Sequence, residues 1–221
     1  VIITLTVLAI IYGGLFDFLR WEQFDTPSYI GGARLLFGLD GAFDFQSRIT
    51  KPLVLVLPGI VELVTTLHPR YTFLLQNIAF FYLCGIFIYK INQLIFKDDK
   101  LAYLGMLAYA TCQPFAIFSL AILSDAAGWF FGIAGIYFTL KIFSEPIVKF
   151  KDVALTGFLV GAGCLAKESA VIGLIFLYSC ILLNELSFKK KAGLFLYSSI
   201  GFIVPFAISF FLIQYFYDDS I

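Results

Sequence analysis

Apolar runs of the length of membrane helices recur along the whole chain and determine its predicted fold. They lie at about 1 to 16, 71 to 96, 101 to 123, 126 to 143, 153 to 166, 169 to 183 and 192 to 216. A hydrocarbon core of about 30 Å needs roughly 20 apolar residues in a helix, so most runs approach or reach spanning length and two are short. The pattern predicts an all-α, polytopic membrane protein with about seven transmembrane helices.

Another apolar stretch, from residue 53 to residue 67, is predicted to lie at the membrane interface or to enter and leave the membrane on one side. It reads LVLVLPGIVELVTTL and contains Pro58, Gly59 and Glu62. Proline removes a helix hydrogen bond, and a run of about 15 residues is short for a span. We therefore leave this stretch out of the span count.

Lys167 and Glu168 lie inside the apolar stretch from 153 to 183. As one helix this stretch would be about 46 Å long, which exceeds a hydrocarbon core of about 30 Å. An unpaired charge there would cost about 2.5 to 3.5 kcal/mol even on a lenient scale. Two short helices in a hairpin, with both charges at the turn, avoid these problems. Because each arm is too short to cross fully, the turn is expected below the outer surface, lining a cavity or buried in protein.

The lysines sort to one side of the seven predicted spans. That side holds Lys90, Lys97, Lys100, Lys141, Lys149, Lys151, Lys189, Lys190 and Lys191. The opposite side holds every arginine and, among the lysines, only Lys51 and Lys167. The positive-inside rule then predicts that the lysine-rich loops are cytoplasmic and that the opposite turns are external.

Composition supports the membrane class and argues against other classes. The chain is 61% hydrophobic and 19% aromatic, with no net charge at pH 7, so a nucleic-acid surface is not expected. The cysteines all lie within apolar runs and are interpreted as small core residues rather than disulfides or metal ligands. The chain begins without Met and ends directly after an apolar run. We treat it as one transmembrane unit, 1 to 221, with truncation at either end left open.

The external loop from 17 to 52 is the long polar segment of the chain and holds the candidate chemistry. Within it, Pro27 suits the first turn of a helix that extends from Thr26 to Phe37, and Gly38 suits its end. Apolar residues recur on one side of this helix, as expected for an amphipathic helix lying on the membrane. Asp25 precedes the helix. Its carboxylate is either a helix cap or a group with a chemical role.

The order of four motifs resembles the GT-C superfamily of membrane glycosyltransferases. The motifs are FDTPSY (24 to 29), RITKP (48 to 52), LSDAAGWF (123 to 130) and LAKESA (165 to 170). The similarity is greatest to the branch that contains protein O-mannosyltransferases and lipid A aminoarabinose transferases. It covers nearly the whole chain, because the superfamily shares an N-terminal unit of seven helices. It departs from the superfamily at Asp25, where many members have an Asp-Glu pair and this chain has Thr26 next; a shared role for Asp17 or Glu22 is left open.

The resemblance implies transfer of a sugar from a polyprenyl-phosphate carrier to an acceptor hydroxyl, outside the cytoplasm or in the lumen of the endoplasmic reticulum. Asp25 is then the candidate base, and inversion at the anomeric carbon is expected. The candidate phosphate ligands are Arg48, Lys51 and Lys167. A multi-pass protein of a bacterial-type plasma membrane or of the endoplasmic reticulum is implied. The expected partners are the sugar lipid, membrane lipids and other membrane subunits.

Several further residues are candidates with a structural alternative beside each role. Asp125 either caps a helix or positions the acceptor or a divalent ion, and Glu168 either pairs with neighbouring helices or lines the donor cavity. Tyr29, like Trp21 and Trp129, either belongs to an interfacial aromatic belt or stacks on a sugar. The single His68 argues against a His-built metal site, and we assign no metal ligands.

Two other functions stay open at the level of the sequence. A non-catalytic relative, binding a lipid carrier or acting as a scaffold within a larger membrane complex, is favoured by the missing second acid and the short chain. A small transporter or flippase is less well supported, because the sequence has no internal repeat and no matching pair of broken helices.

Overall fold

The computed structural model describes residues 1 to 17, 25 to 39 and 49 to 216, and in this part of the chain the regular secondary structure is all helical, without strands. The candidate residues Arg48, Trp21 and Glu22 lie outside the described residues. The elements are α1 (Ile2–Phe16), α2 (Thr26–Leu36), α4 (Pro52–Thr65), α5 (Pro69–Phe96), α6 (Asp99–Thr111), α7 (Gln113–Leu120), α8 (Asp125–Ser144), α9 (Phe150–Cys164), the 3₁₀ helix η2 (Glu168–Val171), α10 (Ile172–Leu183) and α11 (Phe188–Phe216).

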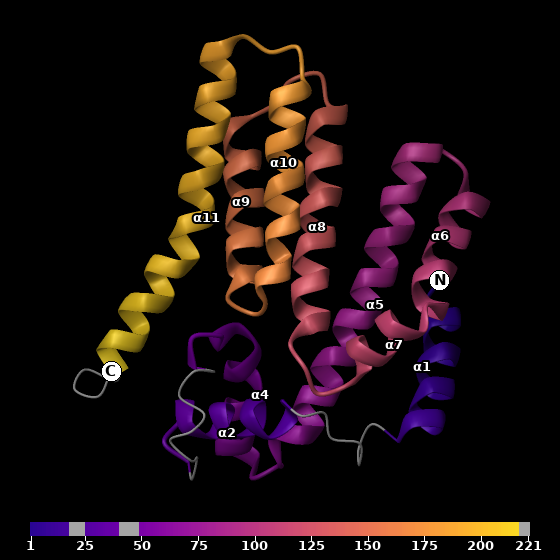
Figure 1. The fold of residues 1–221 in the computed structure, drawn as a ribbon, viewed down its shortest axis with the longest axis vertical. Coiled ribbons are helices and arrows are strands. Elements are labelled where there is room, and N and C mark those ends of the chain that lie inside the picture. Colours follow the sequence, from indigo (N-terminus) through magenta and orange to yellow (C-terminus); the bar gives the residue numbers. More distant parts are fainter. Residues whose placement is uncertain (18–24, 40–48, 217–221) are drawn as a thin grey trace.

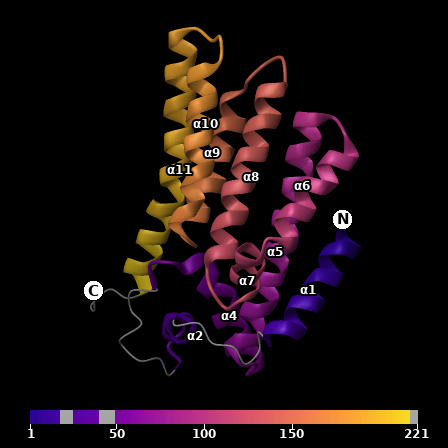
Figure 2. The same cartoon turned by 45° about the vertical axis from the view of Figure 1, so that its right-hand side comes forward.

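The long helices stand side by side and alternate in direction (Figures 1 and 2). Helix α5 packs against α6 and α8, α8 packs against α9 and α10, and α9 packs against α11. The loops between α5 and α6, α8 and α9, and α10 and α11 lie at the top of Figure 1. Helices α2 and α4 and the α9–α10 turn lie toward the opposite end. The lysine-rich loops therefore gather at one end of the molecule, as the sequence predicts.

Among the described residues, three helices are long and apolar enough to cross a membrane by length and composition: Pro69–Phe96, Asp125–Ser144 and α11 over Phe188–Gln214. The bent pair α6 and α7 makes a fourth when it is counted as one span. Large apolar side chains on the outward faces, among them Ile3 and Leu183, are exposed. These features confirm an all-helical protein of membrane type. The count of seven spans stays a prediction.

The predicted helix from 101 to 123 is not continuous. Helix α6 ends at Thr111, α7 ends at Leu120, and the two are bent by 66° at the break. Pro114 has no backbone N–H and its ring crowds the preceding turn, so α6 cannot continue through it. Residues 121 to 124 then form a non-helical connector to α8.

The stretch from 52 to 65 forms helix α4, with Pro58 inside it. Its 14 residues extend about 21 Å, less than a hydrocarbon core of about 30 Å. Helix α2 also forms, close to its predicted bounds. However, Tyr29, Ile30 and Ala33 of its apolar side are buried in a protein core with residues of α4 and α5. This face is therefore largely covered by protein, and a position of α2 on the membrane stays a prediction.

The predicted break at Lys167 is present. Helix α9 ends at Cys164, and Lys167 is extended, with φ −156° and ψ 136°. The N–H groups of Ala166 and Lys167 both donate to the carbonyl of Gly163, at 2.9 and 3.0 Å, and this closes the turn. Helices α9 and α10 then run in opposite directions from a tip that points toward α4 (Figure 1).

Helices α9 and α11 approach so closely that only glycine fits at two positions of α9. A Cβ built on Gly157 would lie 2.2 Å from the Ser198 carbonyl oxygen, and one on Gly161 would lie 2.2 Å from the Phe202 carbonyl oxygen. The obstacle in both cases is backbone, which cannot rotate away. Glycine at these positions allows the backbones to meet, a mode of packing that is common between membrane helices.

Candidate functional site

The connector from 121 to 124 is held in place by a buried amide. Asn77 of α5 is fully buried, and its Nδ2 donates to the carbonyl oxygens of Ala121 and, at 2.9 Å, Leu123. Buried carbonyls without partners cost free energy, so this amide stabilises a backbone that no helix satisfies. The connector determines where α8 begins, and hence where Asp125 lies.

Helix α2 is hydrogen-bonded to the same connector. The Thr26 hydroxyl donates to the Ile122 carbonyl oxygen at 3.3 Å, and the Tyr29 and Ser124 hydroxyls are 2.6 Å apart. Tyr29 is 1% exposed and also makes an edge contact with Phe73. Its ring therefore packs α2 against the protein core, and a role of Tyr29 toward a sugar stays a prediction.

Asp25 occupies the N-cap position of α2, yet its side chain makes no capping hydrogen bond. Its carbonyl oxygen accepts from the Tyr29 N–H at 3.2 Å and from the Ser28 hydroxyl at 2.7 Å. The backbone of Asp25 thus starts the helix, whereas its carboxylate does not cap it. Capping by the side chain, the structural alternative for this residue, is not observed.

Asp125 and Lys167 form an ion pair between α8 and the α9–α10 turn. The distance from Lys167 Nζ to Asp125 Oδ1 is 3.4 Å, and both side chains are largely shielded from solvent. Ser124, not Asp125, occupies the cap position of α8. Asp125 lies in the first turn of α8, so the capping alternative is not observed, and its role in positioning the acceptor or a divalent ion stays a prediction. Gly128 makes room for the lysine, since a Cβ there would lie 2.5 Å from the Cβ of Lys167.

Lys51 and Glu168 form a second ion pair, and Glu168 directly follows Lys167 of the first pair in the chain. The distance from Lys51 Nζ to Glu168 Oε1 is 2.9 Å, with Lys51 16% exposed and Glu168 73% exposed. The hydrogen bond from Lys51 is the main cause that lowers the pKa of the Glu168 carboxyl. Lys51 stands directly before α4, so this pair connects the start of α4 to the α9–α10 turn.

These two pairs bring three separated motifs together. We call Lys51, Asp125, Lys167 and Glu168 the charged cluster. It contains two ammonium groups and two carboxylates, contributed by the start of α4, the start of α8 and the α9–α10 turn. The sequence predicted that charges at the external turns would converge, and the structure places these four in contact. Their roles toward a substrate stay predictions.

An apolar groove of about 510 Å³ lies at the same end of the molecule, between the start of α4, the end of α9 and α11. It is formed by the end of α2, the start of α4, the lower half of α11 and two residues of α9 and its turn. Its lining includes Leu36, Leu53, Val56, Leu165, Pro205 and Leu212. Lys51 precedes the lining residue Pro52, and Lys167 follows Leu165 by two residues. The groove therefore shares the start of α4 and the α9–α10 turn with the two lysines.

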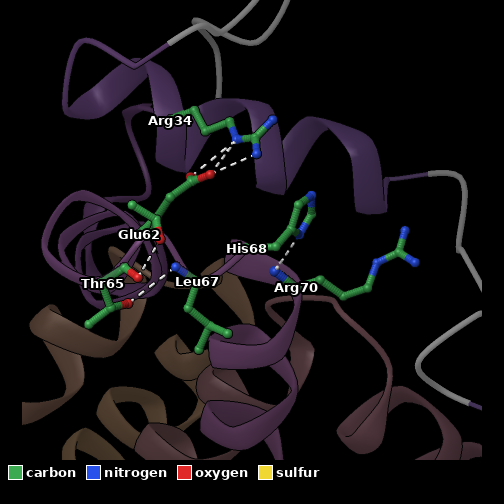
Figure 3. A network of polar contacts seen from close by, with 7 residues as sticks. Arg34, Glu62, Thr65, Leu67, His68 and Arg70 are labelled. Carbon is green, nitrogen blue, oxygen red and sulfur yellow. Dashed lines mark hydrogen bonds and ion pairs between the residues drawn. The ribbon is translucent and has the colours of Figure 1, made fainter.

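Helices α2 and α4 are joined by an ion pair that the sequence did not indicate (Figure 3). The Arg34 guanidinium donates through Nε and Nη2 to the Glu62 carboxylate at 2.7 to 3.1 Å. His68 belongs to the same region as the N-cap of α5, where its Nδ1 accepts from the Arg70 N–H at 3.2 Å. A capping role thus accounts for the single histidine.

Loss of the Arg34–Glu62 pair is expected to destabilise the end of the molecule that holds the groove. Arg34→Ala should lower the free energy of unfolding by about 2 kcal/mol, because Glu62, only 13% exposed, would lose its charged partner. Arg34→Lys keeps the charge but not the planar fork, so a smaller loss is expected. Unfolding curves in detergent measure both variants. Equal midpoints for wild type and Arg34→Ala would contradict this assignment.

In the described part of the chain, no group of three or more His, Cys, Asp or Glu side chains is arranged to hold a metal ion. Comparison with protein-family models, curated proteins and solved structures found no match for this chain. The resemblance to GT-C glycosyltransferases accordingly rests on the order of its motifs.

Proposed function

We propose that this protein is an integral-membrane glycosyltransferase of the GT-C type, which transfers a sugar from a polyprenyl-phosphate carrier to an acceptor on the extracytoplasmic side. The observation that carries the proposal is the apolar groove whose lining residues Pro52 and Leu165 lie one and two residues from Lys51 and Lys167 of the charged cluster. A polyprenyl phosphate has the same two parts, a long apolar chain and an anionic head. Apolar side chains would bind the chain, and ammonium groups would bind the phosphate.

Lys51 and Lys167 are the proposed phosphate ligands, together with Arg48, which lies outside the described residues. In the structure both lysines already have carboxylate partners. Glu168 is mostly exposed and can turn into solvent, so a phosphate oxygen could replace its carboxylate at Lys51. Asp125 and Glu168 are the proposed groups that position the acceptor or a divalent cation.

Asp25 is the proposed general base. It takes the proton of the acceptor hydroxyl while the acceptor oxygen bonds to the anomeric carbon and the bond from that carbon to the phosphate oxygen breaks. The polyprenyl phosphate leaves with the bonding electrons, and the two lysines stabilise its charge. Attack from the side opposite the phosphate gives inversion. The position of Asp25 directly before α2 supports this role. The hydroxyls of Thr26 and Tyr29 on that helix hydrogen-bond to the connector that leads to α8.

The alternating directions of α1, α5, the α6–α7 pair, α8, α9, α10 and α11 support seven passages through or into the membrane (Figure 1). We propose that the lysine-rich end is cytoplasmic, because positive charge is retained on that side. The charged cluster then faces the periplasm of a bacterium or the lumen of the endoplasmic reticulum. In this arrangement the non-helical turn of the short α9–α10 hairpin lies at membrane depth. Such a turn is tolerated there where its backbone is buried in protein or lines a cavity.

A pair of variants separates phosphate binding from ion pairing at Lys51. Lys51→Met should raise the KM for the lipid-linked donor about tenfold, because one charge-assisted contact is lost. Glu168→Gln removes the same ion pair but keeps the ammonium group, so its KM should stay within about twofold of wild type. Initial rates at varied donor concentration measure both. Equal changes in the two variants would assign Lys51 a structural role only.

The second candidate is a non-catalytic subunit that binds a lipid carrier within a larger membrane complex. The existing carboxylate partners of Lys51 and Lys167 favour it, since they already compensate both charges. Purified protein in liposomes, supplied with lipid-linked sugars and acceptor, distinguishes the candidates. Glycan product supports the enzyme, and carrier binding without product supports the subunit. Solute transport without product would favour a transporter and overturn both.

A further inference from the structure

A second cavity, of about 500 Å³, lies at the end of the molecule opposite the charged cluster. It is formed by the last turns of α8, the loop that follows and the first turns of α9. Lys141, Lys149 and Lys151 all line it. This end belongs to the lysine-rich loops, which the positive-inside rule explains only as a topological signal. A topological signal does not explain why these three lysines line one cavity.

The three ammonium groups are available to a ligand. In the part of the chain that the structure describes, none of them forms an ion pair with a carboxylate. Glu145 and Asp152 also line the cavity, so its lining carries a net charge of +1 from three lysines and two acids. Helix α9 begins here, and its N-cap, Lys149, provides no side-chain hydrogen bond to the first turn. Uncapped N–H groups at a helix start add to the attraction for an anion.

The remaining lining of the cavity is mainly apolar. Phe138 and Ile142 come from α8, and Leu155 and Leu159 come from α9. Leu155 is 65% exposed on the outward face of its helix, so the apolar part continues onto the surface that would meet lipid. A soluble phosphate would use the lysines and leave this apolar part uncovered. A phospholipid would use both.

We infer that this cavity binds one anionic phospholipid, with its phosphate at Lys141, Lys149 and Lys151 and the beginning of an acyl chain along Leu155 and Leu159. Basic pockets between membrane helices on the cytoplasmic side suit such headgroups. The site is independent of the proposed glycosyl transfer, because it lies at the other end of α8 and α9. Its occupant would tie the α8–α9 loop to the inner leaflet.

Native mass spectrometry of the detergent-purified protein tests the inference. Dioleoyl phosphatidylglycerol is added to the wild type, to a Lys141→Gln/Lys149→Gln/Lys151→Gln variant and to a matched variant with the same loss of charge outside the cavity, Lys100→Gln/Lys189→Gln/Lys190→Gln. The cavity variant should bind the lipid of the order of a hundredfold more weakly, at about fivefold for each lysine, and the matched variant should bind as the wild type does. The single variants serve the same test where the triple variant fails to fold.

Two competitors identify the ligand. Dioleoyl phosphatidylcholine should bind more weakly than phosphatidylglycerol, and soluble glycerol phosphate should not displace the lipid. Displacement by glycerol phosphate at similar concentrations would overturn the lipid assignment in favour of a soluble phosphate. Equal loss in both triple variants would show general surface attraction instead of a site. Equal binding of the two lipids would also refute the inference.

Discussion

Asp25→Asn is expected to reduce formation of the glycan product by about 100-fold or more, the usual contribution of a positioned general base. Asparagine has nearly the same shape as aspartate but cannot accept the acceptor proton. Because the Asp25 carboxylate does not cap α2, the substitution removes no capping hydrogen bond from that helix. The fall should therefore appear in kcat, with little change in KM for the donor or in the unfolding midpoint. Initial rates in liposomes with equal amounts of protein measure it.

Asp99→Asn is the matched control, since it neutralises an acid in the first turn of α6, at the lysine-rich end. It should leave the rate unchanged. Asp17→Asn tests whether a second acid of the first external loop shares the role, and a larger loss there would move the base to Asp17. Unchanged product in both Asp25→Asn and Asp125→Asn would remove both acids from the mechanism.

Gly161→Ala is expected to destabilise the protein by roughly 1 to 3 kcal/mol, the usual cost of inserting a group into packed structure. The new Cβ would lie 2.2 Å from the Phe202 carbonyl oxygen, so α9 and α11 must separate. This pair of helices forms the most extensive contact in the described structure, and both helices also contribute to the apolar groove. Unfolding in detergent should show the loss, and binding of a polyprenyl phosphate should weaken with it.

The same change at Gly14 provides the control. A Cβ there meets nothing within 4 Å, and alanine favours a helix over glycine by about 0.5 to 1 kcal/mol. Gly14→Ala should therefore leave stability unchanged or raise it slightly. A stable Gly161→Ala protein, or equal effects at both positions, would contradict the close approach of α9 and α11.

The helices themselves could be predicted from the sequence because apolar runs directly report segments that exclude water. The hairpin turn at Lys167 followed from charge and length alone, and the structure contains it. The bend between α6 and α7 was missed. Cys112 and Pro114 sit inside an otherwise apolar run, and the hydropathy of that run hides the break that proline imposes.

The candidate site could be predicted only in part. Convergence of the charged turns followed from their common side, but the partners did not, since Lys51–Glu168 and Asp125–Lys167 depend on how distant helices meet. Asn77 gave a weak signal in the sequence, because it is an amide inside an apolar helix. Such a residue is a candidate for hydrogen bonds to backbone carbonyls, as Asn77 makes to Leu123. The apolar groove had no signal at all, because its lining residues look like ordinary lipid-facing residues in sequence.

We propose that the apolar groove and the charged cluster form one binding site for a polyprenyl phosphate. An experimental structure of the protein with a polyprenyl phosphate bound tests it most directly. We expect the phosphate in contact with Lys51 and Lys167 and the isoprenoid chain along Leu53, Leu165 and Pro205. A phosphate bound at any other place, or an isoprenoid chain lying outside the groove, would contradict the claim.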